Sequence, residues 1–369
     1  MPISDLSFGG FEAFVAGLAP RLVERGHEVT VYCRRDLYRE RPRIHNGVRL
    51  RYVPSIEQKA LGTPLHMTLC SVDAVLRRYD AILVLNSGNG FQCVFLRLLS
   101  SASLALNVDG VEWERGKWGR IARAYFKFAS RVGASVVHTA IADSRAIREI
   151  YKRLFGIRTT FIPYGVSEYS SDDDNELTAR GITKGTYGLI VGRMIPENNV
   201  DILLTGFQDG LPGARLLVVG GSNYRSPFHH RLEQLAGPNV QFLGHVSDQQ
   251  FLWQLFRHSR VYLHGHSVGG TNPALLQALA AGCRIGALDV VFNREVLADA
   301  GEFFHRSPNS VAAVARKLWN VTSSDEQLIR DKAHERIAAG GYDWNSVVTA
   351  YERVLAGINL DTELGKSAK

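Results

Sequence analysis

Cysteine is scarce in this sequence: four occur among 369 residues, and no two form a Cys-x-x-Cys pair. The chain therefore offers neither a disulfide framework nor a thiolate metal site, and we expect a reducing compartment. Histidine is more frequent, and His264 and His266 lie close together, but no His-x-x-x-His or Glu-bearing metal spacing occurs. We expect no bound metal.

Long apolar runs are also missing. The longest, such as AILVL (81–85) and LLVVGG (216–221), have the size of strands, whereas a membrane-spanning helix needs about 20 apolar residues. The start, MPISDLSFGG, has no charged segment followed by an apolar run, so it is not a secretory signal. These absences predict a cytoplasmic protein that does not cross a bilayer.

The composition, 45% hydrophobic and 21% charged, excludes a disordered or fibrous chain, and its length predicts two domains. Lys and Arg number 43 against 36 Asp and Glu, which leaves a net charge of +7. That excess suits polyanions, phosphate-bearing small molecules or anionic lipid. A nucleic-acid partner is not expected, because the basic residues are spread along the chain without a recognition motif.

Short β-branched runs alternate with helical patterns along the whole chain, which predicts two doubly wound, Rossmann-like α/β domains with parallel sheets. The polar, acidic segment 166–186 between them is predicted to be a linker and the lead-in to the second domain. We place the first domain at 1–165 and the second at 166–343, with a last helix in 344–369 that folds back toward the first domain. The predicted strands are 27–32, 48–53, 81–85, 103–108, 139–143, 159–163, 187–192, 214–221, 240–244, 261–266 and 283–288.

The first domain opens on a Gly-Gly turn and an amphipathic helix in 7–32, with only six mostly non-strand residues before Ser7. A doubly wound domain normally begins with a buried strand that leads into such a turn. We therefore expect that the first strand is missing from this sequence, with a start codon assigned too late as the favoured explanation.

The segment GGTNPALLQALAAG (269–282) carries the clearest helix start, with Asn272 or Thr271 as its cap. It follows a predicted strand at the carboxyl edge of a parallel sheet, where such folds bind ligands. The free N–H groups and the helix dipole form an anion site there, and Gly269 and Gly270 let a diphosphate approach closely. The alternative is a plain capped helix.

Arg193 follows another predicted strand end, in VGRMIPENN. An Arg at this place can bridge diphosphate oxygens through hydrogen bonds worth about 1.5–3 kcal/mol each; the alternative is a solvated surface Arg. Two more strands end in glycine turns, one at Gly220 and Gly221 and the other in FLGHVSD. Several glycine-bearing turns on one sheet edge indicate a nucleotide pocket.

In the first domain, Asp109 ends a predicted strand, and Glu112 follows it. A carboxylate here can stabilise an oxocarbenium-like transition state or orient an acceptor hydroxyl, although Asp109 can equally cap its own turn. Glu12, after Gly9 and Gly10, can contact a sugar or serve only as a partner of the helix dipole.

Residues 116–132 have helical periodicity. An aromatic-rich helix with a basic stripe can lie on anionic lipid; the alternative is a core helix with a solvated outer face. One face holds Trp118, Ile121, Ala122, Tyr125, Ala129 and Val132, and the opposite face holds Arg120, Arg123, Lys127 and Arg131.

Over almost its whole length the sequence resembles the GT-B glycosyltransferases of family 4 in bacterial polysaccharide assembly. Within that family, NVDGVEWERGKW and GHSVGGTNP resemble rhamnosyltransferase-like enzymes that act on lipid-linked capsule or cell-wall intermediates. The matching segments are SFGGFEAF, IADSRAIREIYKRLFG, TTFIPYGV, VGRMIPENN, VQFLGHVSD, GGTNPALLQALAAG and YDWNSVVTAYERVL.

The resemblance makes Arg193 the ligand of the donor diphosphate and the turn from Gly269 to Asn272 its cradle. The chain departs from the family at two places. Gln277 replaces the second Glu of a Glu-x7-Glu pair whose first position is Gly269, and Asn198 replaces a Lys, which removes a cation from the diphosphate site. Both remain in the predicted donor-binding set, which also includes Gly220, Gly221, Gly270 and Thr271.

By the same resemblance, we expect a metal-independent enzyme without a cofactor that transfers rhamnose from a nucleotide-diphosphate sugar, with dTDP-rhamnose as the candidate donor. The acceptor is a lipid-diphosphate-linked saccharide at the inner face of the membrane, and the anomeric configuration is retained. Asp109 and Arg193 are the expected catalytic residues, with no protein nucleophile. The expected acceptor-binding residues are Gly9, Gly10, Glu12, Asp109, Glu112 and Trp113, and the expected membrane-binding residues are Trp118, Arg123, Lys127 and Arg131.

Two other functions remain open. A sugar-nucleotide epimerase uses a similar two-domain architecture without a second sugar. A binding or regulatory protein that has kept the fold and lost turnover would explain the departures at Gly269, Gln277 and Asn198.

Overall fold

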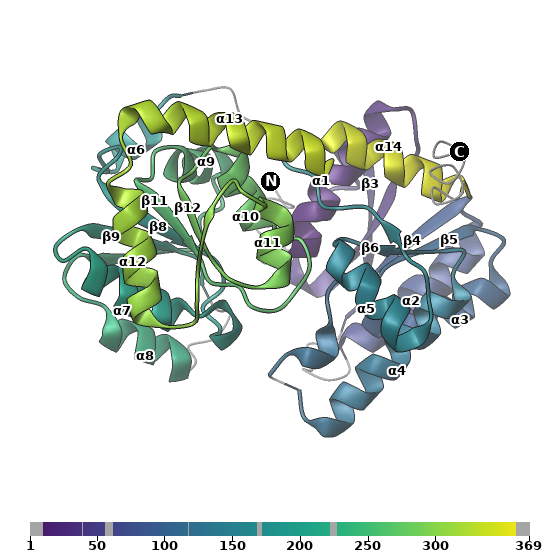
Figure 1. The fold of residues 1–369 in the computed structure, drawn as a ribbon. Coiled ribbons are helices and arrows are strands. Elements are labelled where there is room, and N and C mark those ends of the chain that lie inside the picture. Colours follow the sequence, from purple (N-terminus) through teal and green to yellow (C-terminus); the bar gives the residue numbers. More distant parts are fainter. Residues whose placement is uncertain are drawn as a thin grey trace, which may run out of the picture. The chain divides into compact units, whose positions relative to one another are not determined.

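The chain divides into two compact units (Figure 1). Unit 1 comprises Met1–Gly165 and Trp344–Lys369, and unit 2 comprises Val166–Asp343. These bounds fall at the same residues as the boundary placed from the sequence. The structure, a computed structural model, describes residues 10–38, 40–55, 62–116, 118–167, 172–221 and 227–358.

Unit 2 contains one sheet in which every neighbouring pair of strands is parallel, in the order β10-β9-β8-β11-β12-β13. The chain adds strands on one side of β8 and then on the other, so the order reverses between β8 and β11. Ligands bind at such a switch point, beyond the carboxyl ends of the strands. The strands are β8 (Tyr187–Val191), β9 (Arg215–Val219), β10 (Val240–Gly244), β11 (Val261–His264), β12 (Ile285–Leu288) and β13 (Glu302–Phe304).

Helices cover both faces of this sheet (Figure 1). On one face α7 and α12 bury their apolar sides on β8, β9 and β11, through residues such as Phe207 and Val311. The two helices approach so closely that a Cβ on Gly206 would lie 2.6 Å from the Pro308 carbonyl oxygen. The helices of unit 2 are α6 (Asn175–Ala179), η5 (Pro196–Asn198), α7 (Val200–Gly210), α8 (Pro227–Leu235), α9 (Gln249–Arg257), α10 (Pro273–Ala280), α11 (Val291–Leu297), α12 (Pro308–Trp319) and α13 (Ser323–Gly340).

Among the described residues, unit 1 contains two sheets, β1-β3-β2 and β4-β5-β6-β7. All pairs are parallel except β2 with β3. The expectation of a missing first strand concerns the chain ahead of Ser7, which lies outside the described residues and stays a prediction. The strands are β1 (Thr30–Arg34), β2 (Ile44–His45), β3 (Val48–Val53), β4 (Ala81–Leu85), β5 (Ser103–Asn107), β6 (Thr139–Ala142) and β7 (Thr160–Phe161).

The last helix, α14 (Trp344–Leu355), packs on α1 (Gly10–Glu24) and on β5. The ring of Trp344 fills space that a Cβ would need at Gly17, where the two would be 2.1 Å apart. The Asn107 amide donates to the buried Tyr351 hydroxyl at 2.9 Å. The remaining helices of unit 1 are η2 (Arg35–Leu37), α2 (Gly62–Arg77), η3 (Ser87–Asn89), α3 (Gly90–Leu99), η4 (Glu112–Glu114), α4 (Arg120–Val136) and α5 (Arg145–Phe155).

The α/β fold predicted from the sequence is confirmed, and each predicted strand range overlaps a strand of the structure. The segment 166–186, predicted as a linker and the lead-in to the second domain, contains the short helix α6, whose Leu177 is fully buried. The short strands β2 and β13 were not predicted. Both have three residues or fewer, too few to show an apolar pattern.

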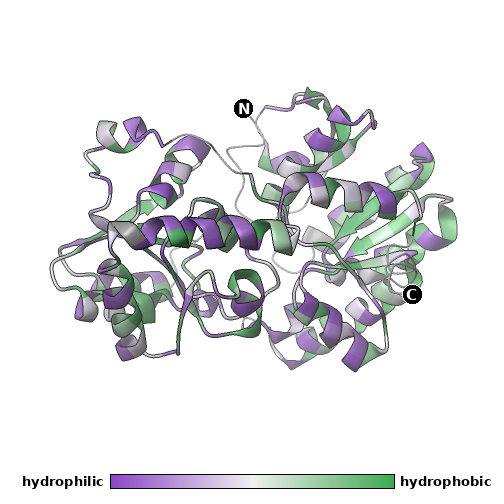
Figure 2. Ribbon diagram, turned by 45° about the horizontal axis from the view of Figure 1, so that its top comes forward, coloured by the Kyte–Doolittle hydropathy of each residue, from purple (hydrophilic) through white to green (hydrophobic). Residues whose placement is uncertain are grey.

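Apolar residues concentrate in the strands and on the inner sides of the helices (Figure 2). The four cysteines are buried and free, and burial raises the pKa of the Cys33 thiol to about 11 and that of Cys283 to about 12. They are therefore protonated packing residues at neutral pH. None of the helices that the structure describes is long and apolar enough to cross a membrane.

Candidate functional site

Two loops meet at the switch point of unit 2, and hydrogen bonds tie them together. The β8 loop (Gly192–Asn199) follows β8, and the β11 loop (Gly265–Asn272) leads from β11 into α10. The Asn199 amide donates to the Gly265 carbonyl oxygen at 2.7 Å. Both the backbone N–H and the hydroxyl of Ser267 donate to the Glu197 carbonyl oxygen, at 3.0 and 2.8 Å. The two loops therefore form one hydrogen-bonded unit at the edge where ligands bind.

Glycine makes this close approach possible. A Cβ on Gly265 would lie 2.3 Å from the Asn198 carbonyl oxygen, and a Cβ on Gly192 would lie 3.0 Å from the His266 ring. Asn199 adopts a left-handed conformation, with φ of 51°, and directly precedes α7. The sequence predicts a helix start near Asn198 or Asn199, but it gives no sign of the bonds that Glu197, Asn199 and Ser267 make between the loops.

Arg193 belongs to the β8 loop and its side chain is exposed at this edge. Its carbonyl oxygen accepts a hydrogen bond of 2.8 Å from the Asn198 amide. Asn198 was predicted to bind the donor, which stays a prediction: its side chain is buried, with 4% exposed, and its N–H₂ group is used within the loop. Asn198 therefore sets the backbone conformation at Arg193.

The start of α10 has the expected form. Asn272 caps the helix, since its side-chain oxygen accepts from the Ala274 N–H at 2.9 Å. Gly269 has a φ of +140°, which side-chain-bearing residues rarely adopt. Thr271 is buried, while Gly270 and Gln277 are partly exposed. The first turn of a helix presents N–H groups without intrahelical partners, so this start can hold an anion.

The turn after β9 joins the same edge. Gly220 has a φ of +123°, and its N–H donates to the Gly244 carbonyl oxygen, at the end of β10, at 2.7 Å. A Cβ on Gly220 would lie 2.0 Å from the Gly192 carbonyl oxygen, whereas the position of a Cβ on Gly221 is open. The Gly220 backbone therefore packs directly on the β8 loop.

Two histidines stack on one another where β11 passes into the β11 loop. The rings of His264 and His266 are 4.5 Å apart and nearly parallel. His264 is buried, and burial together with His266 lowers its pKa well below the usual range, so its ring is neutral at pH 7. Its Nδ1 hydrogen-bonds the Tyr262 hydroxyl at 2.8 Å. His264 therefore supports the loop and does not add a cation to it.

In unit 1, the carboxyl ends of β4 and β5 carry two strained residues, Asn86 with φ of 73° and Asp109 with φ of 59°. Strained backbone of this kind clusters at functional sites. The Asp109 N–H donates to the side chain of Asn107 at 3.0 Å, and the Asp109 carboxylate lies 4.0 Å from the Arg115 guanidinium. Asp109 is thus held at a strand end, as predicted.

Two residues predicted to bind the acceptor, Glu112 and Trp113, are buried in unit 1, and their contact with an acceptor stays a prediction. The Glu112 carboxylate is buried, with one oxygen 2.7 Å from Arg115 and the other accepting from the Trp118 indole at 2.9 Å. The Trp113 ring is buried against Tyr151 and Phe155. Both residues therefore support the loop that follows β5 from within.

Two further residues predicted to bind the acceptor lie at the start of α1. Gly10 is the first residue of this helix, and Glu12 is an exposed residue of its first turn. Gly9 lies outside the described residues.

The helix α4 begins at Arg120, so Trp118 precedes it. Its buried side consists of small residues such as Ala129 and Gly133. The apolar residues expected to share one face therefore do not all face the interior. Ala129 is buried, whereas Ile121 is 89% exposed and Tyr125 is 40% exposed. Arg123, Lys127 and Arg131 are exposed as well.

Among the described residues no group of three or more His, Cys, Asp or Glu is arranged to hold a metal ion.

Two family models cover nearly the whole chain. Residues 9–165 match the glycosyl transferase 4-like domain, and residues 173–344 match the glycosyl transferases group 1 domain. The chain is a GT-B glycosyltransferase. Its donor is a nucleotide sugar. No curated protein sequence matches the chain.

Solved structures show the same fold in this glycosyltransferase's neighbours. Sucrose-phosphate synthase from Thermosynechococcus elongatus has a TM-score of 0.77 and 16% identity, covering 94% of this chain and 92% of its own. WaaG, a glycosyltransferase involved in lipopolysaccharide biosynthesis, has a TM-score of 0.71 and 18% identity, covering 95% and 97%. Anabaena HepE in complex with UDP has a TM-score of 0.71 and 14% identity, covering 95% and 97%.

The contrast between two adjacent glycines tests the geometry of this edge. We expect Gly220→Ala to lower the free energy of unfolding by about 1–3 kcal/mol, because the new Cβ meets the Gly192 carbonyl oxygen and the residue has a positive φ. Gly221→Ala is the matched control, since its Cβ has open space. Chemical denaturation of both variants measures the difference, and equal stabilities would contradict the described packing.

Proposed function

We propose that this glycosyltransferase transfers rhamnose from a nucleotide-diphosphate sugar, with dTDP-rhamnose as the candidate donor, to a lipid-diphosphate-linked saccharide in polysaccharide assembly. The transfer retains the anomeric configuration and needs no metal. The proposed binding of the nucleotide-sugar donor is supported by the hydrogen bonds between the β8 loop and the β11 loop. These loops hold Arg193 and the start of α10 at one edge of the sheet.

The proposed catalysis depends on stabilising the negative charge of the departing diphosphate. Breaking the glycosidic bond leaves negative charge on the departing diphosphate, and donors that are already in place stabilise that charge without reorganisation. Arg193 supplies a cation, and the first turn of α10 supplies N–H groups and the positive end of the helix dipole. The Asn198 hydrogen bond holds the Arg193 backbone in position before the donor arrives.

Asp109 is the proposed catalytic carboxylate of unit 1. Its position at a strand end and its strained backbone support a role near the reacting sugar, either orienting the acceptor hydroxyl or stabilising positive charge at the anomeric carbon. Glu12, exposed in the first turn of α1, is the proposed further contact to the sugar.

The lipid-linked acceptor is supported by the surface of unit 1. Three consecutive helices expose large apolar side chains, and the Phe91 ring of α3 lies 5.9 Å from the rings of Tyr125 and Phe128 on α4. Basic residues of α4 lie beside this apolar surface. Such a combination suits an anionic bilayer, where buried apolar area and basic residues both contribute. The exposed apolar residues are Leu65, Leu69, Val72 and Leu76 on α2, Phe91, Leu98 and Leu99 on α3, and Ile121, Tyr125 and Phe128 on α4.

A nucleotide-sugar-binding protein without turnover is the second candidate, because Gly269 and Gln277 lack the carboxylates of the wider family and Asn198 is used inside its loop. Transfer of radiolabelled sugar into a glycolipid supports the transferase over this candidate. It also excludes the epimerase, which has no acceptor sugar.

Arg193→Ala tests the donor site. We expect the donor KM to rise, kcat to fall and kcat/KM to drop roughly 10- to 100-fold, since a charge-assisted hydrogen bond to the diphosphate is lost. Steady-state kinetics with varied donor measures this, with Arg316→Ala, an exposed Arg of α12, as the matched control. Kinetics equal to those of the control would remove Arg193 from the site.

Charge reversal on α4 tests the membrane proposal. We expect the triple change of Arg123, Lys127 and Arg131 to Glu to weaken binding to anionic vesicles roughly 100-fold, from about 1 kcal/mol for each basic residue near the surface. Vesicle sedimentation measures the bound fraction.

The matched control for this experiment reverses three other exposed cations of unit 1, Arg35, Arg41 and Arg43, which gives the same change in net charge. Equal sedimentation of the two triple variants would show that charge alone, and not α4, governs binding.

A further inference from the structure

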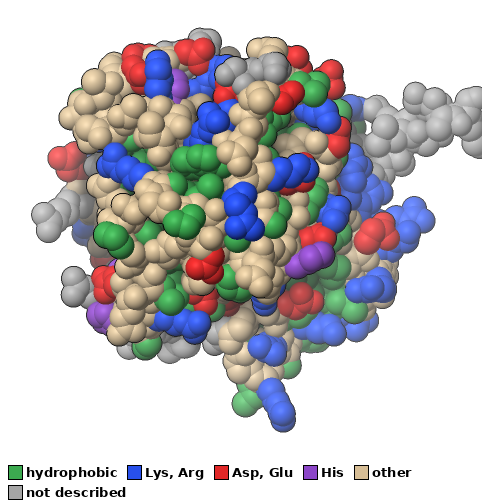
Figure 3. Space-filling view, turned by 60° about the vertical axis from the view of Figure 1, so that its left-hand side comes forward, with side chains coloured by type: hydrophobic (Ala, Val, Ile, Leu, Met, Phe, Trp, Pro, Cys, Tyr) green, Lys and Arg blue, Asp and Glu red, His purple; other side chains and the backbone are tan. Residues whose placement is uncertain are grey.

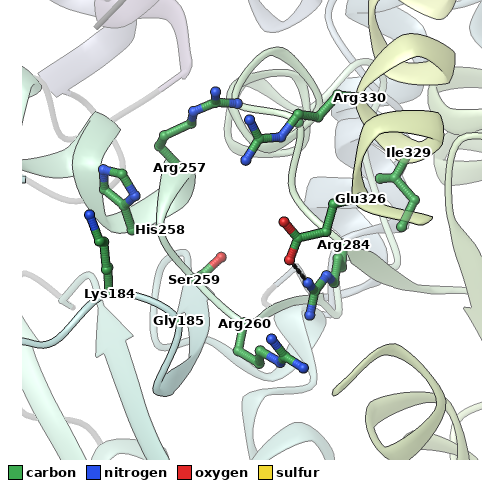
Figure 4. A pocket seen from close by; sticks show the side chains of 11 residues that line it. Lys184, Gly185, Arg257, His258, Ser259, Arg260, Arg284, Glu326, Ile329 and Arg330 are labelled. Carbon is green, nitrogen blue, oxygen red and sulfur yellow. Dashed lines mark hydrogen bonds and ion pairs between the residues drawn. The ribbon is translucent and has the colours of Figure 1, made fainter. Parts of the chain in front are cut away.

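A cationic pocket lies at the amino edge of the unit 2 sheet, opposite to the edge that carries the proposed donor site (Figure 4). Its volume is about 170 Å³. It is lined by residues that directly precede β8, β11 and β12, by the end of α9 and by α13. Five of its lining residues are cations, namely Lys184, Arg257, Arg260, Arg284 and Arg330, and its one carboxylate is Glu326.

Three of these cations, Arg257, Arg260 and Lys184, interact with carboxylates or with backbone carbonyl oxygens at helix ends. Arg257 pairs with Asp172 and donates to the Ala281 carbonyl oxygen at 3.1 Å, just beyond α10. Arg260 donates to the Trp319 carbonyl oxygen at 2.8 Å, at the end of α12. Both positions suit a cation, because helix ends carry partial negative charge. At the rim, Lys184 lies 3.2 Å from Asp174, and His258 contacts the Asp173 carbonyl oxygen at 3.1 Å.

The positive charge of Arg284 and Arg330 is compensated less completely. Arg284 is buried and pairs with Glu326 through Nη2, but its Nη1 is buried without a hydrogen-bond partner. Figure 4 shows the guanidinium groups of Arg330 and Arg257 pointing toward one another. Burial and the neighbouring Arg260 and Arg330 lower the pKa of Arg284 to about 10, and burial and Arg257 lower the pKa of Arg330. Like charges are therefore held together at a cost in free energy.

We propose that this pocket binds a phosphate group, which bridges the guanidinium groups of Arg284 and Arg330 between α13 and the start of β12. A phosphate has several oxygens and can accept hydrogen bonds from more than one guanidinium group. The planar guanidinium of Arg is well suited to such contacts. It also relieves the repulsion between Arg330 and Arg257. The site is distinct from the donor site, because it lies at the opposite edge of the same sheet.

The size of the pocket limits the ligand. About 170 Å³ is the space of roughly six water molecules and is less than the 300 Å³ or more of a typical pocket for a larger organic ligand. Orthophosphate or the phosphate of a small phosphomonoester fits this volume. Basic side chains elsewhere are scattered among acidic ones on the face that Figure 3 draws, so the pocket differs from a general basic surface.

Binding to sodium phosphate, measured by calorimetry at constant ionic strength, tests the proposal. We expect binding to the wild-type chain and to Arg193→Ala, whose donor site is impaired. Arg330→Gln should weaken the affinity roughly tenfold or more, because it removes a charged donor and keeps the side-chain stem. Glucose 6-phosphate, as the second probe, shows whether a phosphomonoester binds as well as free phosphate.

Lys332→Gln is the matched control, since it removes a cation from the same helix outside the pocket. It should bind phosphate as the wild type does. Without phosphate, Arg330→Gln should be at least as stable as the wild type, because it relieves repulsion, whereas a structural role for Arg330 would make this variant less stable. Equal affinities of Arg330→Gln and wild type, loss of binding in Arg193→Ala, or no binding to the wild type would each overturn the proposal.

Discussion

The hydrogen bonds between the β8 loop and the β11 loop are the constraint on which the proposed activity depends. Asn199 and Ser267 join two segments that are far apart in the chain, and Gly265 lets their backbones meet. Because both loops leave the sheet at its switch point, the linkage sets where Arg193 stands relative to the start of α10. Preorganisation of this kind lets a departing diphosphate be stabilised without movement of the protein.

Charge in unit 2 is divided between the two edges of one sheet. At the carboxyl edge, the groups that can bind an anion are one exposed arginine, backbone N–H groups and the helix dipole of α10. His264 adds no charge, because burial keeps its ring neutral. At the amino edge five cations surround a small hollow. The departures of Gln277 and Asn198 from the wider family therefore leave the donor site dependent on Arg193 and α10. The amino-edge pocket cannot compensate for a cation missing at the opposite edge.

Most of the fold could be predicted because buried parallel strands are short, β-branched and bounded by helices, as in 81–85 and 187–192. The cap at Asn272 was also predictable, since it depends on local sequence. Burial was not: whether Asn198 or Trp113 faces a ligand or the interior depends on tertiary packing. The cationic pocket was equally hidden, because its residues are spread from Lys184 to Arg330 and meet only in the folded sheet.

Hydrogen exchange of the full chain with and without a nucleoside diphosphate, using UDP and dTDP as probes, tests the central claim most directly. The account predicts slower exchange at amides of the β8 loop and of the first turn of α10 when the nucleotide binds. Protection confined to other parts of unit 2, or no change at Gly270 and Arg193 with a nucleotide that does bind, would contradict it.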